Sequence, residues 1–426
     1  MSTDTPTGTT GTADDTAAAA IDPRLLIREE GFAGYLNEFK RKVRGGELGS
    51  LPVVIGLIVI WLVFGLQNSS FFTSRVFEQI LFLMLPVGTL SIGLVFVLLL
   101  GEIDLSVASV AGLSAAVFAT TSVTHGMNDW LAGLLTIVTG ALIGTVQGFV
   151  FARIGVPAFV VTLAGFLGWQ GVMLWLLGST QAITLPDTGL SHLLSGTSYF
   201  MGGDIAGAYI LAVLAVAALL GSSLLEQRRR RAAGVPFRPT SEILVRSGLL
   251  AIAAFVAAYV LNQFQGVPNA LVLFLVLLVV TDFVLRRTGY GRKIFAVGGG
   301  IEAARRAGIN IVLVRTSVYA ISGAFAALAG LLLATQLETA STDISDPNNL
   351  MMAIAGAVIG GTSLFGGRGR VWSALLGALV IESISYGLAM LGMNAWVNDV
   401  ITGAVLLVAV IVDSLSRKAQ KASGRG

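Results

Sequence analysis

The chain has 426 residues, of which 55% are apolar and 12% are charged, and its mean hydropathy is +0.83. Soluble domains carry about 25% charged residues, so this composition excludes a soluble globular protein and indicates an integral membrane protein. The chain has no cysteine, which excludes a disulfide framework and a thiolate metal site. The two histidines, His125 and His192, fall in predicted outside loops, and lone histidines are more often surface residues than a metal site. We therefore expect no metal, and we also expect no cofactor and no nucleic-acid partner.

Two segments precede the first apolar run. Residues 1–23 are rich in Thr, Ala, Gly and Asp without apolar periodicity, which predicts a disordered tail. This tail lacks the basic and apolar regions of a secretory signal peptide, so we expect the N-terminus in the cytoplasm. In residues 24–48, Phe32, Tyr35 and Phe39 share one helical face and basic residues follow them. This pattern predicts an amphipathic helix on the inner membrane surface.

Apolar runs dominate residues 49–414, which we interpret as a transmembrane domain. A helix needs about 20 apolar residues to cross about 30 Å of hydrocarbon. The predicted fold class is therefore all-α: a polytopic integral membrane bundle of about 12 transmembrane segments. The first and tenth runs are short, so we expect tilted, broken or partly re-entrant helices there. The runs are 51–66, 77–100, 105–122, 130–152, 158–178, 206–225, 247–264, 267–285, 316–337, 350–364, 371–391 and 396–413.

The basic residues orient these runs. With the N-terminus inside, every Lys and Arg except Arg75 falls on the inner side, as the positive-inside rule requires. A missed run early in the chain would break this alternation, so the charges support the number of runs as well. Both termini are then cytoplasmic, and residues 415–426 are a basic cytoplasmic tail. The second to fifth and ninth to twelfth runs are an odd number of places apart, so a structural repeat between them would be inverted.

Two breaks between runs are unusual. Glu102, Asp104 and Ser106 lie between two runs with almost no loop, although a charge at membrane depth costs roughly 2.5–3.5 kcal/mol. Two interpretations remain open: Asp104 or Ser106 caps the following helix, or this break lines a pathway. The other break, residues 360–370, is rich in glycine and is expected to be a turn between two helices.

The longest polar insertion between apolar runs is 286–315. It carries seven Lys and Arg residues, which predicts a cytoplasmic position. Residues 301–308 favour a short helix, because they are mostly good helix formers and Gly308 supplies a stop. Gly298 to Gly300 are expected to form a flexible or tightly turned segment before it.

These motifs, in order, resemble the sugar-permease family of bacterial ATP-binding-cassette (ABC) importers, which includes ribose and xylose permeases. The coupling-loop signature of such importers is Glu-Ala-Ala, three residues, then Gly. Three apolar runs precede the coupling loop where ribose-type permeases have one, which is similar to the xylose branch. Glu102 and Glu382 depart from the family pattern. The coupling signature is matched by Glu302, Ala303, Ala304 and Gly308, and the other matching segments are 70–73, 103–106, 157–163, 288–292, 309–310 and 360–369.

The resemblance implies a monosaccharide permease, for xylose or a related sugar, in the bacterial cytoplasmic membrane. It implies that the chain forms the translocation pathway and is not itself an enzyme. The implied partners are an ATPase subunit that binds the coupling loop, an extracytoplasmic sugar-binding protein, membrane lipid and a second permease in a homodimer. The pathway residues that it suggests are Asp104, Ser106, Thr162, Thr362 and Ser363.

An ion-coupled secondary transporter is the alternative interpretation. Such a protein would use carboxylates within the membrane. Of the candidates, Asp282 and Asp413 lie near the ends of runs, where an interfacial position is expected. An intramembrane enzyme is disfavoured, because facing runs show no paired His/Asp/Glu or Ser/Lys arrangement. The candidate carboxylates are Glu102, Asp104, Asp282, Glu382 and Asp413.

Overall fold

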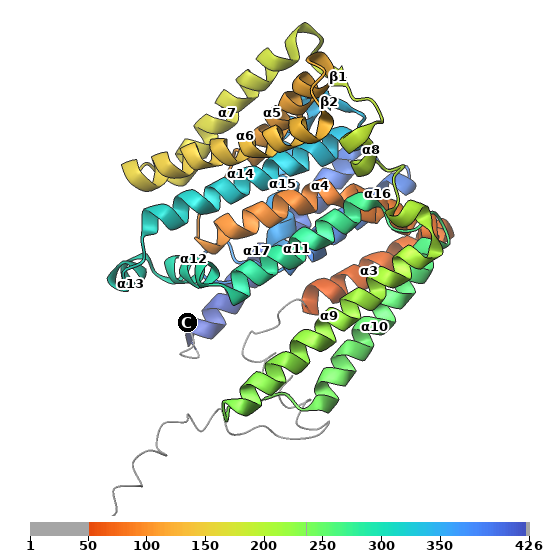
Figure 1. Cartoon of the computed structure of the whole chain (residues 1–426), viewed down its shortest axis with the longest axis vertical. Coiled ribbons are helices and arrows are strands. Elements are labelled where there is room, and N and C mark those ends of the chain that lie inside the picture. The colour runs from red at the N-terminus through yellow and green to blue at the C-terminus, as the bar shows by residue number, and fades with distance from the viewer. Residues whose placement is uncertain (1–50, 236, 423–426) are drawn as a thin grey trace, which may run out of the picture.

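The structure is a computed structural model that describes residues 51–235 and 237–422, with side chains through residue 415. The predicted tail 1–23, the predicted amphipathic helix 24–48 and residues 423–426 lie outside the described residues. The rest is mostly helical (Figure 1). In chain order the elements are α3 (Leu51–Gln67), η1 (Ser69–Phe72), α4 (Ser74–Leu99), α5 (Val107–Ala119), η2 (Thr120–Thr124), α6 (Asp129–Phe149), η3 (Val150–Ile154), α7 (Ala158–Leu177), η4 (Gly178–Thr180), β1 (Ala182–Thr184), α8 (Gly189–Leu194), η5 (Phe200–Gly203), α9 (Ile205–Ala232), α10 (Thr240–Asn262), α11 (Asn269–Arg287), α12 (Gly289–Gly299), α13 (Ile301–Arg306), α14 (Ile311–Gln336), β2 (Thr339–Ser341), η6 (Thr342–Ser345), α15 (Pro347–Ile359), α16 (Trp372–Met390) and α17 (Ala395–Ala422).

The predicted all-α membrane fold is confirmed. Within the described residues, 10 helices are long and apolar enough to cross a membrane, and α3 and α15 are shorter apolar helices of 17 and 13 residues. These two are the first and tenth predicted runs, which we expected to be short. The sequence predicts the tenth run through residue 364, whereas α15 ends at Ile359. It ends there because Gly361 has a φ of +108°, which a right-handed helix does not accommodate.

Helices α4 and α14 form the centre of the bundle. α4 packs against α14, α15 and α16, and α14 packs against α4, α5 and α6. In addition, α5 packs against α7, and α15 packs against α17. The second to fifth predicted runs are α4–α7, and the ninth to twelfth are α14–α17. The contacts of α4 with α15 and α16 correspond to those of α14 with α5 and α6, and the contact of α5 with α7 corresponds to that of α15 with α17. This pairing is what a structural repeat between the two sets would produce.

Small residues allow α6 and α14 to approach each other closely. A Cβ atom at Gly144 would overlap the carbonyl oxygen of Tyr319, and one at Gly148 would lie 2.7 Å from the Tyr319 Cβ. In lipid, close van der Waals packing between helices replaces the hydrophobic driving force that acts in water. The glycines of α6 are therefore packing residues rather than flexible points.

Basic residues gather at one end of the helices, which we call the basic end. It comprises Arg153 and the segments 228–246, 286–315 and 368–370. Figure 1 shows the α9–α10 connection, α12, α13 and the end of α17 on this side, with β1, β2 and α8 on the opposite side. At the opposite end β1 pairs antiparallel with β2, with Ala182 facing Ser341. This segregation of charge agrees with the positive-inside rule.

Helices α9 and α10 form a hairpin at the side of the bundle (Figure 1). They pack mainly against each other, and only 11% and 17% of their apolar windows are buried. An ion pair of 3.0 Å between Glu226 and Arg287 joins the basic end of α9 to α11. Most of the hairpin surface is therefore free to contact lipid.

Candidate functional site

Asp104 is the centre of a buried polar cluster in the break between α4 and α5. Only 2% of the residue is exposed. One carboxylate oxygen accepts hydrogen bonds from the Ser106 N–H at 3.0 Å and the Ser106 hydroxyl at 2.6 Å. The other accepts one from the Ser322 hydroxyl of α14 at 3.0 Å. Burial raises the pKa of Asp104, and the hydrogen bonds from Ser106 and Ser322 oppose that rise.

The cluster extends to α6 and α7. The Ser106 hydroxyl lies 2.9 Å from Oε1 of Gln147, a residue that is 4% exposed. Gln147 Nε2 and Trp169 Nε1 are buried donors without a partner among the described residues. A Cβ atom at Gly165 would contact both of these nitrogens, so they lie on the same side of α7. Buried donors of this kind call for an acceptor such as water or a substrate hydroxyl.

Glu102 forms an ion pair with Arg315 of α14 at 3.1 Å. Their side chains are 21% and 17% exposed, and the Arg315 guanidinium lies 4.6 Å from the ring centroid of Phe151. Burial raises the pKa of Glu102, and the charge of Arg315 opposes that rise. The ion pair therefore links the break before α5 to the first turns of α14.

The short helix that the sequence predicts at residues 301–308 is α13. It spans Ile301–Arg306, and Gly308 follows with a φ of +76°, in the left-handed region that favours glycine. Glu302 pairs with Arg305 at 3.0 Å on the exposed face of the helix. Ala303 is exposed beside them, and Ala304 is buried and holds α13 against the bundle.

The segment before α13 differs from the prediction. Gly298 and Gly299 belong to α12, a helix that the sequence analysis did not predict, and only Gly300 breaks the chain before α13. A Cβ atom at Gly298 would overlap the carbonyl oxygen of Leu99, so this position requires glycine for a tertiary reason. Glycine serves here for close approach to α4 rather than for flexibility.

Helix α12 also meets the turn between α15 and α16. The Gly367 N–H donates to the Leu99 carbonyl at 2.9 Å. A Cβ atom at Gly366 would lie 2.9 Å from the Gly101 nitrogen and 3.0 Å from the Gly298 carbonyl oxygen. We call these three segments, which meet at Gly101, Gly298 and Gly366, the glycine junction. These contacts are between backbones, so α12 packs directly against the end of α4 and the break that precedes Asp104.

The remaining pathway candidates bond to other partners. Thr162 is buried and donates to the Ala158 carbonyl of its own helix at 3.0 Å. Thr362 shares a hydrogen bond of 2.5 Å with Ser373, and Ser363 donates to Asp413 of α17 at 3.0 Å. The structure therefore brings Asp104 and Ser106 together but not the other three with them. Sequence reasoning missed Ser322 and Gln147, which are unremarkable within their apolar runs.

Most carboxylates named for the ion-coupled alternative have partners. Asp282 pairs with Arg286 at 2.9 Å, and Asp413 accepts a hydrogen bond from Ser363. Glu102 and Asp104 are held as described above. Within the described part of the chain, Glu382 of α16 has neither a hydrogen bond nor an ion pair.

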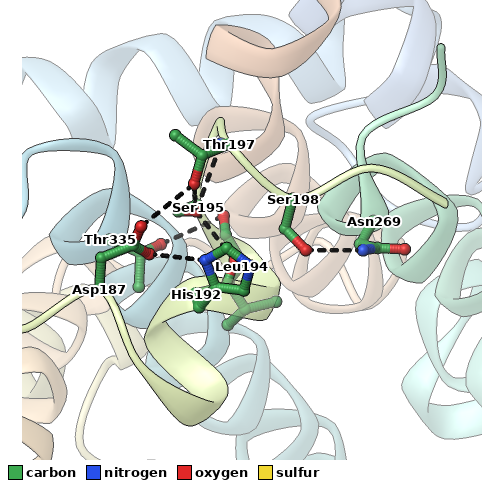
Figure 2. Close-up of polar contacts among 8 residues, drawn as sticks. All are labelled: Asp187, His192, Leu194, Ser195, Thr197, Ser198, Asn269 and Thr335. Carbon is green, nitrogen blue, oxygen red and sulfur yellow. Dashed lines mark hydrogen bonds and ion pairs between the residues drawn. The ribbon is translucent and has the colours of Figure 1, made fainter. Parts of the chain in front are cut away.

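A polar network lies at the opposite end of the bundle. Figure 2 shows the segment around α8 meeting the start of α11 and the end of α14. Asn269 donates to the Ser198 hydroxyl at 2.8 Å, and His192 lies 3.0 Å from Asp187. Thr335 donates to the Leu194 carbonyl at 3.4 Å. These contacts hold the connection between α7 and α9 in place.

Comparison with known proteins identifies the family to which the chain belongs. Residues 76–410 match the family described as "Branched-chain amino acid transport system / permease component". The xylose transport system permease protein XylH of Escherichia coli K12 is 35% identical over 367 residues, 86% of this chain and 92% of XylH. XylH of Haemophilus influenzae is 32% identical over 88% of this chain and 99% of that protein. The ribose import permease protein RbsC of Bacillus subtilis is 28% identical over 88% and 96%.

No solved structure matches the chain. The matched residues run from α4 into α17 and so include the Asp104 cluster, the glycine junction and α13. With its bundle of apolar helices, the chain belongs to the sugar-permease family of ABC importers, the family of the xylose and ribose permeases.

Proposed function

We propose that this chain is the permease subunit of an ABC importer for a monosaccharide, xylose or a related sugar, in a bacterial cytoplasmic membrane. The observation that carries the proposal is similarity to XylH along nearly the whole length of both proteins. The family description names branched-chain amino acids, but the relatives cited above are xylose and ribose permeases. A sugar is therefore the favoured substrate.

The proposed partners follow from the two ends of the bundle. The basic end faces the cytoplasm, where the exposed face of α13 with Glu302, Ala303 and Gly308 binds a separate ATPase subunit. The opposite end receives sugar from an extracytoplasmic binding protein. Two copies of the chain form the importer, and ATP is hydrolysed by the partner, so this chain acts by moving rather than by catalysis.

The contacts at the basic end suggest how movement reaches the pathway. Helix α13 is followed directly by α14, which carries Ser322, and α12 touches the glycine junction. Both routes end at the break that holds Asp104. In this proposal the binding of ATP shifts α12 and α13 together, and the shift alters the cluster around Asp104 so that the pathway opens to one side at a time.

Sugar uptake into membrane vesicles tests this function. Vesicles that contain the permease and its ATPase are supplied with ATP or with an ion gradient alone, and the binding protein delivers labelled xylose. ATP should drive uptake, and unlabelled xylose, ribose, glucose and galactose should compete to different extents. Uptake driven by the gradient alone would favour the ion-coupled alternative and would direct attention to Glu382. Competition by leucine but by no monosaccharide would reject the sugar assignment.

A further inference from the structure

The ion pair of Glu102 and Arg315 forms part of the wall of a cavity at the basic end. The cavity has a volume of about 330 Å³. Its lining comes from the break before α5, the connection between α6 and α7, and the start of α14. It combines the two charged side chains with apolar surface from residues such as Ile103, Val156 and Pro157. Small-molecule sites typically have volumes of about 300–1,000 Å³ and a few polar groups in a mainly apolar wall.

The wall offers both donors and acceptors of hydrogen bonds. Arg315 Nε is buried and has no hydrogen-bond partner among the described residues. The first turn of α7, at Ala158 and Phe159, also lines the cavity, and no side chain caps it, so its N–H groups remain available. The Glu102 carboxylate supplies acceptors, since its ion pair with Arg315 uses only part of its capacity.

The balance of charge decides which class of ligand fits. An anion bound beside Arg315 would also face the Glu102 carboxylate, and a cation bound beside Glu102 would face the guanidinium. The ion pair makes the wall neutral overall, so a neutral molecule with several hydroxyl groups fits best. Each hydroxyl can donate to the carboxylate or accept from a nitrogen, and the C–H faces of a sugar ring suit the apolar part of the wall.

We propose that this cavity binds the transported monosaccharide at the basic end of the pathway. The inference rests on the proposed function and adds to it a location for the sugar. The cavity borders Ile103, the residue next to Asp104, so it lies beside the cluster that α12 and α14 reach. A sugar in this cavity would contact Glu102 and Arg315, and both side chains contribute to the site.

Binding of D-xylose to the purified full-length permease in lipid nanodiscs tests the proposal, with saturation-transfer NMR as the measurement. We expect the wild type to bind xylose weakly and Glu102→Gln to bind at least tenfold more weakly. Val156→Trp should abolish binding, because it fills the cavity and leaves the ion pair in place. Val235→Trp is the matched control, since Val235 is an exposed valine in the α9–α10 connection, and it should bind as the wild type does.

A loss of binding in Glu102→Gln can also arise from misfolding, so Val156→Trp tests the cavity separately. Its folding is verified when its gel-filtration profile equals that of Val235→Trp. Unchanged xylose binding in Val156→Trp would overturn the proposal, as would absence of binding in the wild type. Displacement of xylose by inorganic phosphate would show an anion site and would also overturn it.

Failure of the proposed function and failure of the cavity assignment give different experimental results. If ATP drives no monosaccharide uptake by the wild type, the assignment as a sugar importer fails whatever the nanodisc result. If uptake is normal but wild-type xylose binding is absent or survives Val156→Trp, only the cavity assignment fails.

Discussion

Asp104 shows at the scale of single residues how a buried carboxylate is retained. Its two oxygens accept three hydrogen bonds, from the Ser106 N–H and the hydroxyls of Ser106 and Ser322. An unpaired buried charge would be far more costly than one held in this way. No side chain caps α5: Asp104 accepts from the N–H of Ser106, the residue that precedes α5, and its other oxygen joins this break to Ser322 of α14.

The first prediction compares Asp104 with Glu382. In Asp104→Asn, an amide NH₂ replaces one oxygen and faces a hydrogen-bond donor, and leaving a buried group unsatisfied costs about 1–3 kcal/mol. We expect ATP-driven uptake to fall at least tenfold at equal expression. Glu382→Gln should keep uptake within about twofold of the wild type, since Glu382 has no polar partner among the described residues. The reverse outcome would support the ion-coupled alternative.

Helix α13 is the element through which we expect coupling to the ATPase. Its exposed face combines Glu302 and Arg305, and the chain leaves it through the left-handed Gly308. A side chain in that conformation is costly, at roughly 1–2 kcal/mol for a residue other than glycine. Local disruption of α13 should therefore separate coupling from the folding of the membrane domain.

The second prediction uses Gly308→Val and Glu302→Lys. Both variants should insert normally, lose co-purification with the ATPase and lose ATP-driven uptake. Gly234→Val is the matched control, because Gly234 has a φ of +66° and, like Gly308, has no heavy atom within 4 Å of an added Cβ. Wild-type co-purification and uptake in both α13 variants would show that α13 is only a solvated connection.

The contact between α6 and α14 is sensitive to side-chain size. Gly144→Val would place a side chain against the Tyr319 carbonyl, and overpacking typically costs 1–3 kcal/mol or more. We expect a lower thermal unfolding temperature in detergent, or loss of a monodisperse protein.

Gly168→Val on α7 is the control for this third prediction, because Gly168 is exposed and an added Cβ meets no atom within 4 Å. It should unfold at the wild-type temperature. Equal temperatures for Gly144→Val and Gly168→Val would show that α6 and α14 do not pack as described.

At the scale of the whole molecule, the orientation in the membrane is the fourth prediction. The natural chain has no cysteine, so single cysteines can be labelled without background. Cysteine at Asn348 should react with an impermeant reagent from outside the cell, and cysteine at Gly299 only after the cytoplasmic face is exposed. Asn348 is chosen because it is exposed and a reagent can reach it. Ser345, in the same loop, is only 1% exposed and would not be labelled efficiently. Labelling of both positions from the same side would refute the topology.

The sequence by itself determined the spans, the asymmetry of charge and the position of α13. These are local properties, because the number of apolar residues that crosses a bilayer is set by its thickness, and Gly308 stops a helix through its own backbone conformation. The two spans of the α9–α10 hairpin were predicted for the same reason, since each is apolar over its own length.

Only the tertiary structure decided which polar groups meet. Ser322 lies 218 residues from Asp104 and Arg315 lies 213 residues from Glu102, and nothing local marks either as a partner. The same holds for Gly298, which lies in α12 and approaches the Leu99 carbonyl so closely that only glycine fits. In lipid, these contacts depend on which helix faces pack against each other, and that depends on the shapes of helices far apart in the chain.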